Sequence, residues 1–446
     1  MAVYPSREEK LKYIRNYIQS GEKKRSDREM GVELEHLVID QKTKKRRFYY
    51  EERGVRELLQ RISALEGLEG IYKQNELLGV QGPDYEISIE PGAQFEISLS
   101  KQEKISDLYR IYRGALDSVF PILKELDAGL LTLGMDPVNA VEDIPLIPKR
   151  RYEIMNEYLG QRGSLTRYMM RLTCALQISI DFSDEEDFRK KYRLATALTP
   201  ILYTLFDNSP LLEGRPIDHF NMRQKIWKNT DPDRCGLVPS AFEPDFGYEA
   251  YARWILDNPV LFIPQLDGSV KDLGAMTCEQ ALDLAETEEE ARAIVEHALS
   301  IVFPDVRVKR YIEIRPMDEV PEQYAFAAAA LIKGIFYHQP SLDRLAEYFS
   351  EGSLEMVERG KNSGNDNGIQ GFYFSHYFAH WGLILIDLAE QGLDDEERVF
   401  LQPLKELWDN LDTPRSVFER LEEEGGRQLA LEAFQVSDRP RIHLSK

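Results

Sequence analysis

The sequence predicts an α+β protein in which a curved, mainly antiparallel sheet with an acidic concave face packs on helices. Helical and strand-like segments alternate along the whole 446-residue chain, and four strand-like segments share one apolar face and one polar, mostly acidic face. Such a sheet buries its apolar face against helices and leaves the other face free. No break in composition marks a boundary, so we expect one domain over 1–446, with a helical lead-in at 1–28 and a C-terminal tail at 411–446.

Composition and charge narrow the range of partners. Hydrophobic residues make up 43% of the chain, which is enough for a large core. The formal net charge of −21 argues against nucleic acid and against an anionic membrane surface, because both are bound by basic faces. The oligomeric state stays open.

The expected location is a reducing cytoplasm. The charged N-terminal stretch "MAVYPSREEKLKYIRNYIQS" lacks the apolar core of a signal peptide, and no run of about 18 apolar residues that could span a membrane occurs. Cys174, Cys235 and Cys278 have no CxxC spacing and are odd in number, which disfavours a disulfide framework or a zinc ribbon.

Helices are predicted where apolar residues recur every three or four positions. This spacing occurs at 7–19 and in a long stripe at 103–127, where Gly129 would cap the carboxyl end. The segments 279–300 and 322–338 are also predicted to be helical.

Two further local signals predict a helix after residue 183 and a loop at 360–368. Ser183 and Glu186 have the form of a capping box before another helix, which Pro200 should kink or interrupt. The stretch "GKNSGNDNG" at 360–368 is the strongest loop signal in the chain, because glycine and asparagine tolerate positive φ.

The first acidic strand is "GVELEHLVID" at 31–40. Glu33 and Glu35 share one face of it, with Leu34 on the other, because successive side chains of a strand alternate. Two carboxylates therefore lie side by side.

The next acidic pair lies in "EISIEPGAQFEIS" at 86–98. Pro91-Gly92-Ala93 reverses the chain between two alternating runs, and pairing of these runs as a hairpin would put Glu90 and Glu96 on the same face near the turn.

Two later strands repeat the pattern. In "CALQISIDF" at 174–182, Gln177 lies on the polar face. In "VRVKRYIEIRP" at 306–316, Glu313 and Arg315 lie on the polar face of what is predicted to be one strand.

Carboxylates gathered on one face repel one another, and without compensation the pKa of one or more would rise. Oxygen ligands without a His or Cys cluster suit hard cations such as Mg²⁺, which typically accompany nucleotide phosphates. Arg315 could then stabilise a transferring phosphoryl group. For any single strand, a solvated polar face is the simpler interpretation. Walker A and GxSxG sequences are missing, so a P-loop site and a nucleophile-elbow hydrolase lack their motifs.

These segments, in this order, resemble a known family, the plant and proteobacterial type of glutamate–cysteine ligase within the glutamine synthetase-like superfamily. "GVELEHLVID" is similar to the family's G-x-E-x-E strand, and "SIEPGAQFEIS" to its L-E-P-G-G-Q-F-E-L-S hairpin. "NMRQKIWKNTDPDRCG" at 221–236 and "FPDVRVKRYIEIR" at 303–315 follow in the family's order. The resemblance spans roughly residues 10–410 and rests on specific motifs.

The resemblance implies a glutamine synthetase-like catalytic fold and the ATP-dependent joining of the glutamate γ-carboxylate to the amine of cysteine through a γ-glutamyl phosphate. This is the first step of glutathione-type thiol synthesis. The implied cofactor is Mg²⁺ (or Mn²⁺), with ATP as co-substrate and small molecules as the only partners. By analogy, the metal ligands are Glu33, Glu35, Glu90, Glu96 and Glu313.

The resemblance also assigns catalytic and binding roles. Glu313 and Arg315 would be catalytic, with Arg315 neutralising the transferring phosphoryl group. The residues implied to bind substrate or ATP are Gln94, Gln177, Arg171, Arg223, Trp227 and Arg234. For Arg223 and Arg234, structural ion pairs with Asp231 or Asp233 are an equal alternative.

Three positions depart from the family's pattern. Ser179 stands where the family usually has Asn, Leu34 where plant-type members have His, and Pro316 where Gly commonly follows the arginine. A γ-glutamyl ligase for another amine or amino acid therefore stays open, as does a non-catalytic homologue that binds Mg-nucleotide.

Overall fold

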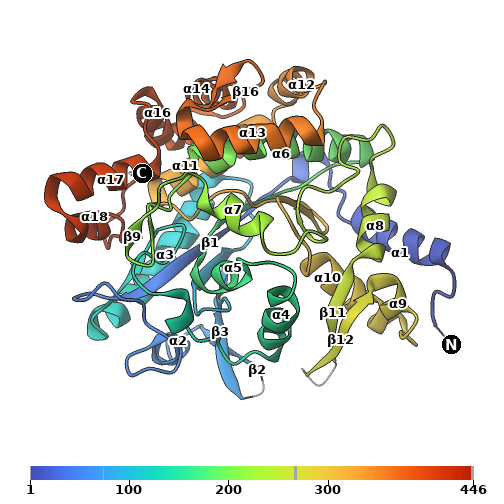
Figure 1. Cartoon of the computed structure of the whole chain (residues 1–446), viewed down its shortest axis with the longest axis horizontal. Helices are drawn as coiled ribbons and strands as arrows, with labels where there is room; N and C mark the ends of the chain where they lie inside the picture. Colours follow the sequence, from blue (N-terminus) through green and yellow to red (C-terminus); the bar gives the residue numbers. More distant parts are fainter. Residues whose placement is uncertain (1, 74, 266–268, 443–446) are drawn as a thin grey trace.

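The predicted α+β class and antiparallel sheet are confirmed by the computed structural model of the chain, which describes residues 2–73, 75–265 and 269–442 (Figure 1). The strands of the main sheet are β1 (Met30–Asp40), β2 (Glu69–Lys73), β3 (Glu76–Gln81), β4 (Tyr85–Ile89), β5 (Phe95–Leu99), β6 (Ala128–Leu131), β7 (Leu176–Ile180), β14 (Val306–Val308) and β15 (Ile312–Ile314). Their order is β14-β15-β7-β1-β5-β4-β3-β2, and β6 pairs with the far end of β1.

The register of the sheet gathers the polar residues on one face. Glu35 lies opposite Glu96, and Glu33 lies opposite Gln177. Glu313 continues this row one strand further, opposite Ser179. The alternate residues face the other way and are fully buried, as expected for a two-faced antiparallel sheet.

Helices surround the sheet. They are α1 (Arg7–Gln19), α2 (Val55–Ser63), α3 (Ile105–Glu125), α4 (Arg150–Gly160), α5 (Thr166–Leu172), α6 (Glu185–Leu205), α7 (Met222–Lys228), α8 (Tyr248–Asp257), α9 (Cys278–Leu282), α10 (Glu288–Ser300), α11 (Glu322–Phe336), α12 (Gln339–Tyr348), α13 (Leu354–Asn367), α14 (Phe378–Gln391), α15 (Asp395–Arg398), α16 (Gln402–Asp409), α17 (Pro414–Gly425) and α18 (Arg427–Ala433). Helices α3, α6 and α11 contact the sheet strands and bury the apolar face. None of the helices in the described ranges has the length and apolar character needed to cross a membrane.

Short elements complete the chain. Four small two-stranded ladders pair β8 (Leu211–Leu212) with β9 (Arg215–Pro216), β10 (Cys235–Gly236) with β13 (Phe303–Pro304), β11 (Pro259–Pro264) with β12 (Val270–Thr277), and β16 (Phe372–Tyr373) with β17 (His376–Tyr377). The 3₁₀ turns are η1 (Arg25–Asp27), η2 (Val141–Asp143), η3 (Gly368–Gln370) and η4 (Val399–Leu401).

Several predicted boundaries were wrong. The segment 306–316 forms a hairpin of β14 and β15 rather than one strand. The segment 279–300 is divided into α9 and α10, because Thr287 starts a new helix with its own capping box. Helix α3 ends at Glu125 with Leu126 as its cap, and Gly129 is instead a residue of β6.

Helix α6 begins and continues differently from the prediction. Its cap is Asp184, whose side chain accepts from the Asp187 amide, and not Ser183. Pro200 lies inside the helix without ending it. Proline cannot donate to the carbonyl four residues earlier, but the Thr199 hydroxyl donates to that same carbonyl, of Thr196, at 2.9 Å. The side chain thus replaces the missing main-chain donor.

The predicted loop at 360–368 is also wrong, because these residues form most of α13. Its glycines let the helix pack closely. A Cβ on Gly360 would lie 2.4 Å from the Tyr373 ring, and one on Gly364 would lie 2.3 Å from Thr204 Oγ1. Gly368, at φ 55°, then ends the helix.

Both ends of the chain pack on the rest. In the lead-in, α1 contacts α8. The segment predicted as a C-terminal tail carries α17 and α18, whose Phe418, Leu431 and Phe434 form a second apolar cluster with Leu37 of β1 and Leu131 of β6.

The close contact at Gly364 predicts that replacing this glycine by alanine lowers the stability of the protein, the reverse of the usual result inside a helix. Gly364→Ala should destabilise the protein by about 1–3 kcal/mol through overpacking, although alanine is the better helix former. The control is Gly114→Ala in α3, where a Cβ meets nothing within 4 Å; this change should stabilise by about 0.5–1 kcal/mol. Urea unfolding measures both, and equal effects of the two variants would contradict the packing argument.

Candidate functional site

A cavity of about 270 Å³ lies between the acidic face of the sheet and helices α4, α5 and α7. It is lined by Glu33, Glu35, Glu90, Pro91, Gln94, Glu96, Arg151, Tyr152, Met155, Met169, Met170, Thr173, Gln177, Arg223, Trp227, Ser300, Phe303, Arg307, Lys309 and Arg315. Nine of the twelve sequence-predicted site residues therefore share one cavity: Glu33, Glu35, Glu90, Glu96, Gln94, Gln177, Arg223, Trp227 and Arg315.

The β4–β5 hairpin brings Glu90 to the cavity. The Ala93 amide donates to the Glu90 carbonyl at 2.8 Å, and the Glu90 amide donates to the Gln94 carbonyl at 3.0 Å. Ala93, not Gly92, has the positive φ of 64°. Gly92 is needed for another reason, since a Cβ there would lie 2.6 Å from the Arg171 carbonyl oxygen. The turn is therefore pressed against the chain that leads into β7.

Gln94 fastens this turn. Its side-chain oxygen accepts from the Gly92 amide at 2.9 Å, and its Nε2 donates to the Thr173 carbonyl at 3.0 Å. Because this side chain is 1% exposed, the hairpin is held to β7 by a buried contact as well as by the sheet.

The carboxylates crowd one another. Burial, followed by the charge of Glu90, raises the pKa of Glu35 to about 8. Burial and then Glu33 raise the pKa of Glu96 well above its usual range, and burial and then Glu313 raise the pKa of Glu33. Within the described residues, however, no three His, Cys, Asp or Glu side chains already converge on a common ion position.

An arginine cluster closes the β15 side of the cavity. Arg307 donates twice to the Glu313 carboxylate, at 2.6 and 3.0 Å, and Arg315 donates to it at 2.9 Å. Burial alone would raise the pKa of Glu313, but the charges of Arg307, Lys309 and Arg315 outweigh it and hold that pKa well below the usual range. Arg315 also donates to the side-chain oxygen of Gln177.

Helix α7 supplies the opposite wall. Arg223 and Trp227, one turn apart, both line the cavity. The guanidinium carbons of Arg223 and Arg315 lie 5.7 and 5.6 Å from the Trp227 ring centre, so the indole lies against both cations. Arg223 also donates to the Arg315 carbonyl at 3.3 and 3.2 Å, which ties the helix to the end of β15.

Three predicted residues lie outside the cavity lining. Glu313 lies behind it, bound to the arginines. Arg171 points away and donates to the Val141 carbonyl at 3.4 Å. Arg234 is fully buried, pairs with Asp231 at 2.7 Å and donates to main-chain carbonyls. For Arg234, the structure therefore shows the structural ion pair that was the alternative to ligand binding.

Sequence reasoning missed three cations of the site: Arg151, Arg307 and Lys309. The first belongs to the basic run "KRRY" at 149–152, which was a usable signal. The other two lie on β14 and next to it, and were overlooked because 306–316 was taken as one strand rather than a hairpin.

A second cavity, of about 320 Å³, adjoins the first. Arg151 lines both of them. The second cavity also has Lys149, Phe262 and His297 in its walls. It extends from strands β2, β3 and β4 of the sheet to the β11–β12 ladder.

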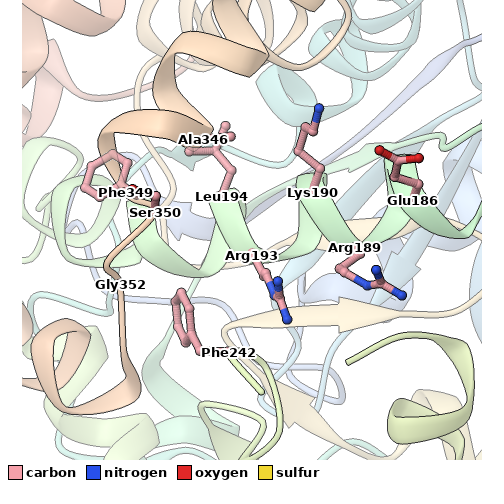
Figure 2. A pocket seen from close by; sticks show the side chains of 10 residues that line it. All are labelled: Glu186, Arg189, Lys190, Arg193, Leu194, Phe242, Ala346, Phe349, Ser350 and Gly352. Atoms are coloured by element: carbon pink, nitrogen blue, oxygen red, sulfur yellow. The ribbon is translucent and has the colours of Figure 1, made fainter. Parts of the chain in front are cut away.

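A separate cavity of about 380 Å³ lies over α6 (Figure 2). It is lined by the basic side chains Arg189, Lys190 and Arg193, with Phe242 and Phe349 as apolar walls. It shares no lining residue with the acidic cavity and holds none of the predicted site residues, so the acidic cavity is the candidate active site.

Cys174 and Cys278 are buried, and Cys235 is half-buried. Burial raises the pKa of Cys235 and of Cys278 to about 12 and that of Cys174 well above its usual range. All three are unpaired in the structure.

The fold and site define a class of α+β protein in which one face of an antiparallel sheet forms a cavity lined by carboxylates and arginines. Among solved structures, glutamate–cysteine ligase from Francisella tularensis, in complex with AMP, matches with a TM-score of 0.56 at 11% identity, covering 91% of this chain and 87% of that one. At this identity the match concerns the fold.

Sequence comparison gives the family. The model of glutamate-cysteine ligase family 2 (GCS2) matches residues 29–359. The chloroplastic glutamate–cysteine ligase of Medicago truncatula is 32% identical to this chain over 399 residues, which cover 88% of this chain and 78% of the relative. That of Nicotiana tabacum is 32% identical over 398 residues, which cover 88% of this chain and 76% of the relative. That of Arabidopsis thaliana is 31% identical over 398 residues. The chain belongs to glutamate-cysteine ligase family 2, and the resemblance inferred from its motifs is confirmed.

One departure from the family pattern can now be located. Leu34 is fully buried on the apolar face of β1, opposite the cavity. Its side chain therefore has no access to a substrate. Ser179 is on the polar face, next to Glu313 in the sheet.

The crowded carboxylates predict a pH-dependent stability. Because the pKa of Glu35 is raised to about 8, the folded protein keeps a proton there that the unfolded chain loses at lower pH. The contribution of Glu35 to the free energy of unfolding therefore falls as the pH rises towards about 8 and is constant above that. In EDTA, Glu35→Gln should raise Tm by about a few degrees at pH 8 and change it little near pH 5.

Thermal unfolding at both pH values tests this, with Glu86→Gln, at an exposed position of β4, as control. A Tm gain for Glu35→Gln that is the same at both pH values would contradict the assignment.

Proposed function

We propose that the protein is an ATP-dependent glutamate–cysteine ligase, which joins the glutamate γ-carboxylate to the amine of cysteine. The observation that carries this proposal is a single cavity in which Glu33, Glu35, Glu90 and Glu96 face Arg223 and Arg315. Its product would enter glutathione-type thiol synthesis. The family, the fold and the ordered motifs support the same reaction.

The reaction has two group transfers. A γ-carboxylate oxygen of glutamate attacks the γ-phosphorus of ATP, the bond to the ADP oxygen breaks, and γ-glutamyl phosphate forms. The amine nitrogen of cysteine then attacks the acyl carbon, phosphate leaves with the carbon–oxygen electron pair, and the nitrogen loses a proton. Positioning and charge stabilisation supply most of the catalysis, so no protein nucleophile is needed.

The cationic walls fit these steps. We assign to Arg315 the stabilisation of charge on the transferring phosphoryl group, with Arg307 beside it. Glu313 engages both guanidiniums, which fixes their direction, and this suits an orienting role better than metal binding. Arg223, against Trp227, suits an amino-acid carboxylate because guanidinium binds planar carboxylates with two hydrogen bonds.

The adjoining cavity is the proposed nucleotide subsite. Lys149 and Arg151 offer positive charge to phosphates, and Phe262 offers an apolar wall to a base. Arg151 belongs to both cavities, so the terminal phosphate would lie near it, at the junction with the acidic cavity.

The acidic wall fits a divalent cation by its chemistry. Glu33, Glu35, Glu90 and Glu96 offer only oxygen donors, and their mutual repulsion, visible in the raised pKa values of three of them, is what a bound cation relieves. These four residues would hold Mg²⁺ (or Mn²⁺), which supplies charge neutralisation to ATP. Gln94 and Gln177 would orient this wall.

Two alternative functions were considered beside the ligase with cysteine as acceptor. A different amine acceptor is suggested by Ser179 and Pro316, since Leu34 faces away. A non-catalytic Mg-nucleotide binder is disfavoured because four of the five predicted carboxylates line one cavity. We infer that the whole chain forms the catalytic unit, because both ends of the chain pack on the rest of the fold.

For the location we keep the cytoplasm, which suits three unpaired thiols, although the plant relatives are named chloroplastic.

The direct test of the activity is ADP release by the purified protein with ATP, Mg²⁺ and glutamate. We expect release that depends on cysteine and is small with alanine, glycine or ethylamine. Release with one of these amines but not with cysteine would replace the acceptor and keep the ligase class. No release with any amine, together with binding of Mg-ATP, would favour the non-catalytic alternative.

Removing the Arg315 charge should slow the chemical step. We expect Arg315→Met to lower kcat by about 10²–10³-fold, the usual cost of losing one donor to developing charge. The control is Arg253→Met, which removes an exposed guanidinium that pairs with Glu249 at 3.1 Å. Steady-state kinetics of both variants check this, and an Arg315→Met rate within twofold of the control would remove Arg315 from the site.

A further inference from the structure

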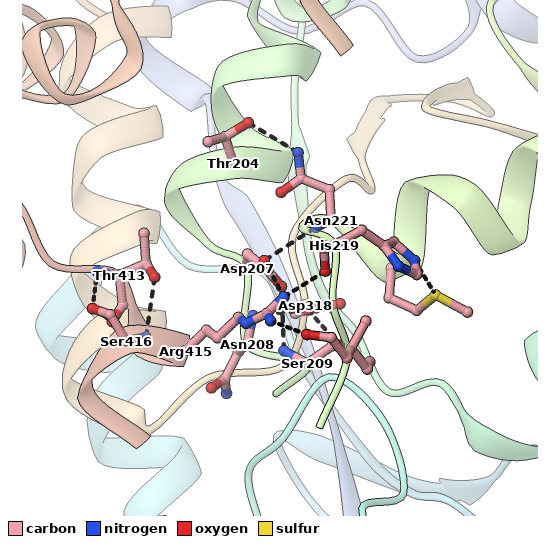
Figure 3. Close-up of polar contacts among 12 residues, drawn as sticks. Thr204, Asp207, Asn208, Ser209, His219, Asn221, Asp318, Thr413, Arg415 and Ser416 are labelled. Carbon is pink, nitrogen blue, oxygen red and sulfur yellow. Dashed lines mark hydrogen bonds and ion pairs between the residues drawn. The ribbon is translucent and has the colours of Figure 1, made fainter. Parts of the chain in front are cut away.

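A buried polar network joins helix α17 to the segment that enters α7 (Figure 3). Arg415, the second residue of α17, is 5% exposed. Its two terminal nitrogens donate to the carbonyls of Ile217 at 2.6 Å and His219 at 2.7 Å, and its Nε donates to Glu419 at 2.7 Å. One side chain thus satisfies two carbonyls of a non-helical segment directly before α7.

Asp207 is the anionic partner in this network. Its Oδ2 lies 3.5 Å from Arg415 Nη1 and accepts from the Asn221 amide at 3.0 Å. The Arg415 amide in turn donates to the Asp207 carbonyl at 3.0 Å. Burial raises the pKa of Asp207, and the charge of Arg415 opposes this increase, so without Arg415 a buried carboxylate would lose its cation.

Asn221 connects the network to the start of α7. It precedes the first helical residue and has φ 53°, a left-handed conformation that asparagine tolerates better than most residues. Its Nδ2 donates to Thr204 Oγ1 at 3.1 Å. With its amide on Asp207 and its side chain on α6, the start of α7 is fixed from two directions.

The helix that starts there carries two cavity residues. Arg223 and Trp227 lie two and six residues after Asn221. Arg223 also holds the Arg315 carbonyl. A displacement of the 217–221 segment would therefore move a wall of the cavity.

The network crosses the limit of the family match. The family model ends at residue 359, whereas Arg415 lies 56 residues beyond it (415 − 359). The contact to the α7 entry is therefore made by a part of the chain outside the matched region.

We propose that Arg415 is a positioning residue for the reaction: it fixes the entry to α7 and thereby places Arg223 and Trp227 in the cavity. Arg415 itself touches no substrate in this arrangement. Its effect on turnover rests on the proposed ligase function, whereas its effect on the mobility of α7 does not.

The test compares Arg415→Met with Arg420→Met. Arg420 lies on the same helix but is exposed and forms a surface ion pair with Asp412. For Arg415→Met we expect kcat/KM for the amino-acid substrates to fall by about tenfold or more, the scale of small misplacements in an active site, with a smaller change in KM for ATP. Hydrogen exchange of the 217–228 amides should accelerate. Arg420→Met should change neither, and equal behaviour of the two variants overturns the proposal.

A double variant separates positioning from general stability. Asp207→Asn in the Arg415→Met background removes the stranded charge and keeps an oxygen for the Asn221 amide, so Tm should recover. The carbonyls of Ile217 and His219 would still lack their donor, so kcat/KM should stay low. Recovery of kcat/KM in step with Tm would overturn the positioning role. If the wild-type protein shows no ligase activity, the proposed function fails, and accelerated exchange at 217–228 in Arg415→Met alone still decides the structural claim.

Discussion

The repulsion between glutamates on one buried sheet face is the constraint on which the site depends. The register that sets Glu35 opposite Glu96 is imposed by the apolar residues of the other face, since a shift by one residue would turn Val32 and Leu34 towards the cavity. The packing of the core therefore forces the carboxylates together. Their mutual repulsion is unfavourable in the protein alone, and the cation proposed for this wall would relieve it.

The arginines do not cancel this repulsion, because the protein keeps them apart from it. Arg307 and Arg315 are engaged by Glu313, one strand beyond Gln177 and Ser179. The cavity thus has an anionic wall and a cationic wall, and the cations lower the pKa values of Glu33 and Glu35 by less than burial and repulsion raise them. Separated charges of this kind are suited to a substrate that brings both cations and phosphates.

The sequence predicted what depends on alternation and on local motifs. The polar face of β1, β5 and β7 and the β4–β5 hairpin follow from period two, and the family follows from the ordered motifs. What escaped prediction depends on tertiary contacts. Gly360 and Gly364 suggest a loop until α6 is known to lie against them, and Pro200 suggests a helix end until the Thr199 hydroxyl is seen to replace its amide. Likewise, the pairing of Arg234 with Asp231 instead of a ligand could not be decided from spacing alone.

The buried cysteines have a consequence for a protein whose proposed substrate is itself a thiol. Exchange with a disulfide requires a thiolate, and the pKa of each described cysteine is far above neutrality. Cystine formed by oxidation of cysteine would therefore meet side chains that are held as thiols, the form that does not attack a disulfide. This would protect the proposed ligase against mixed disulfides with its own substrate.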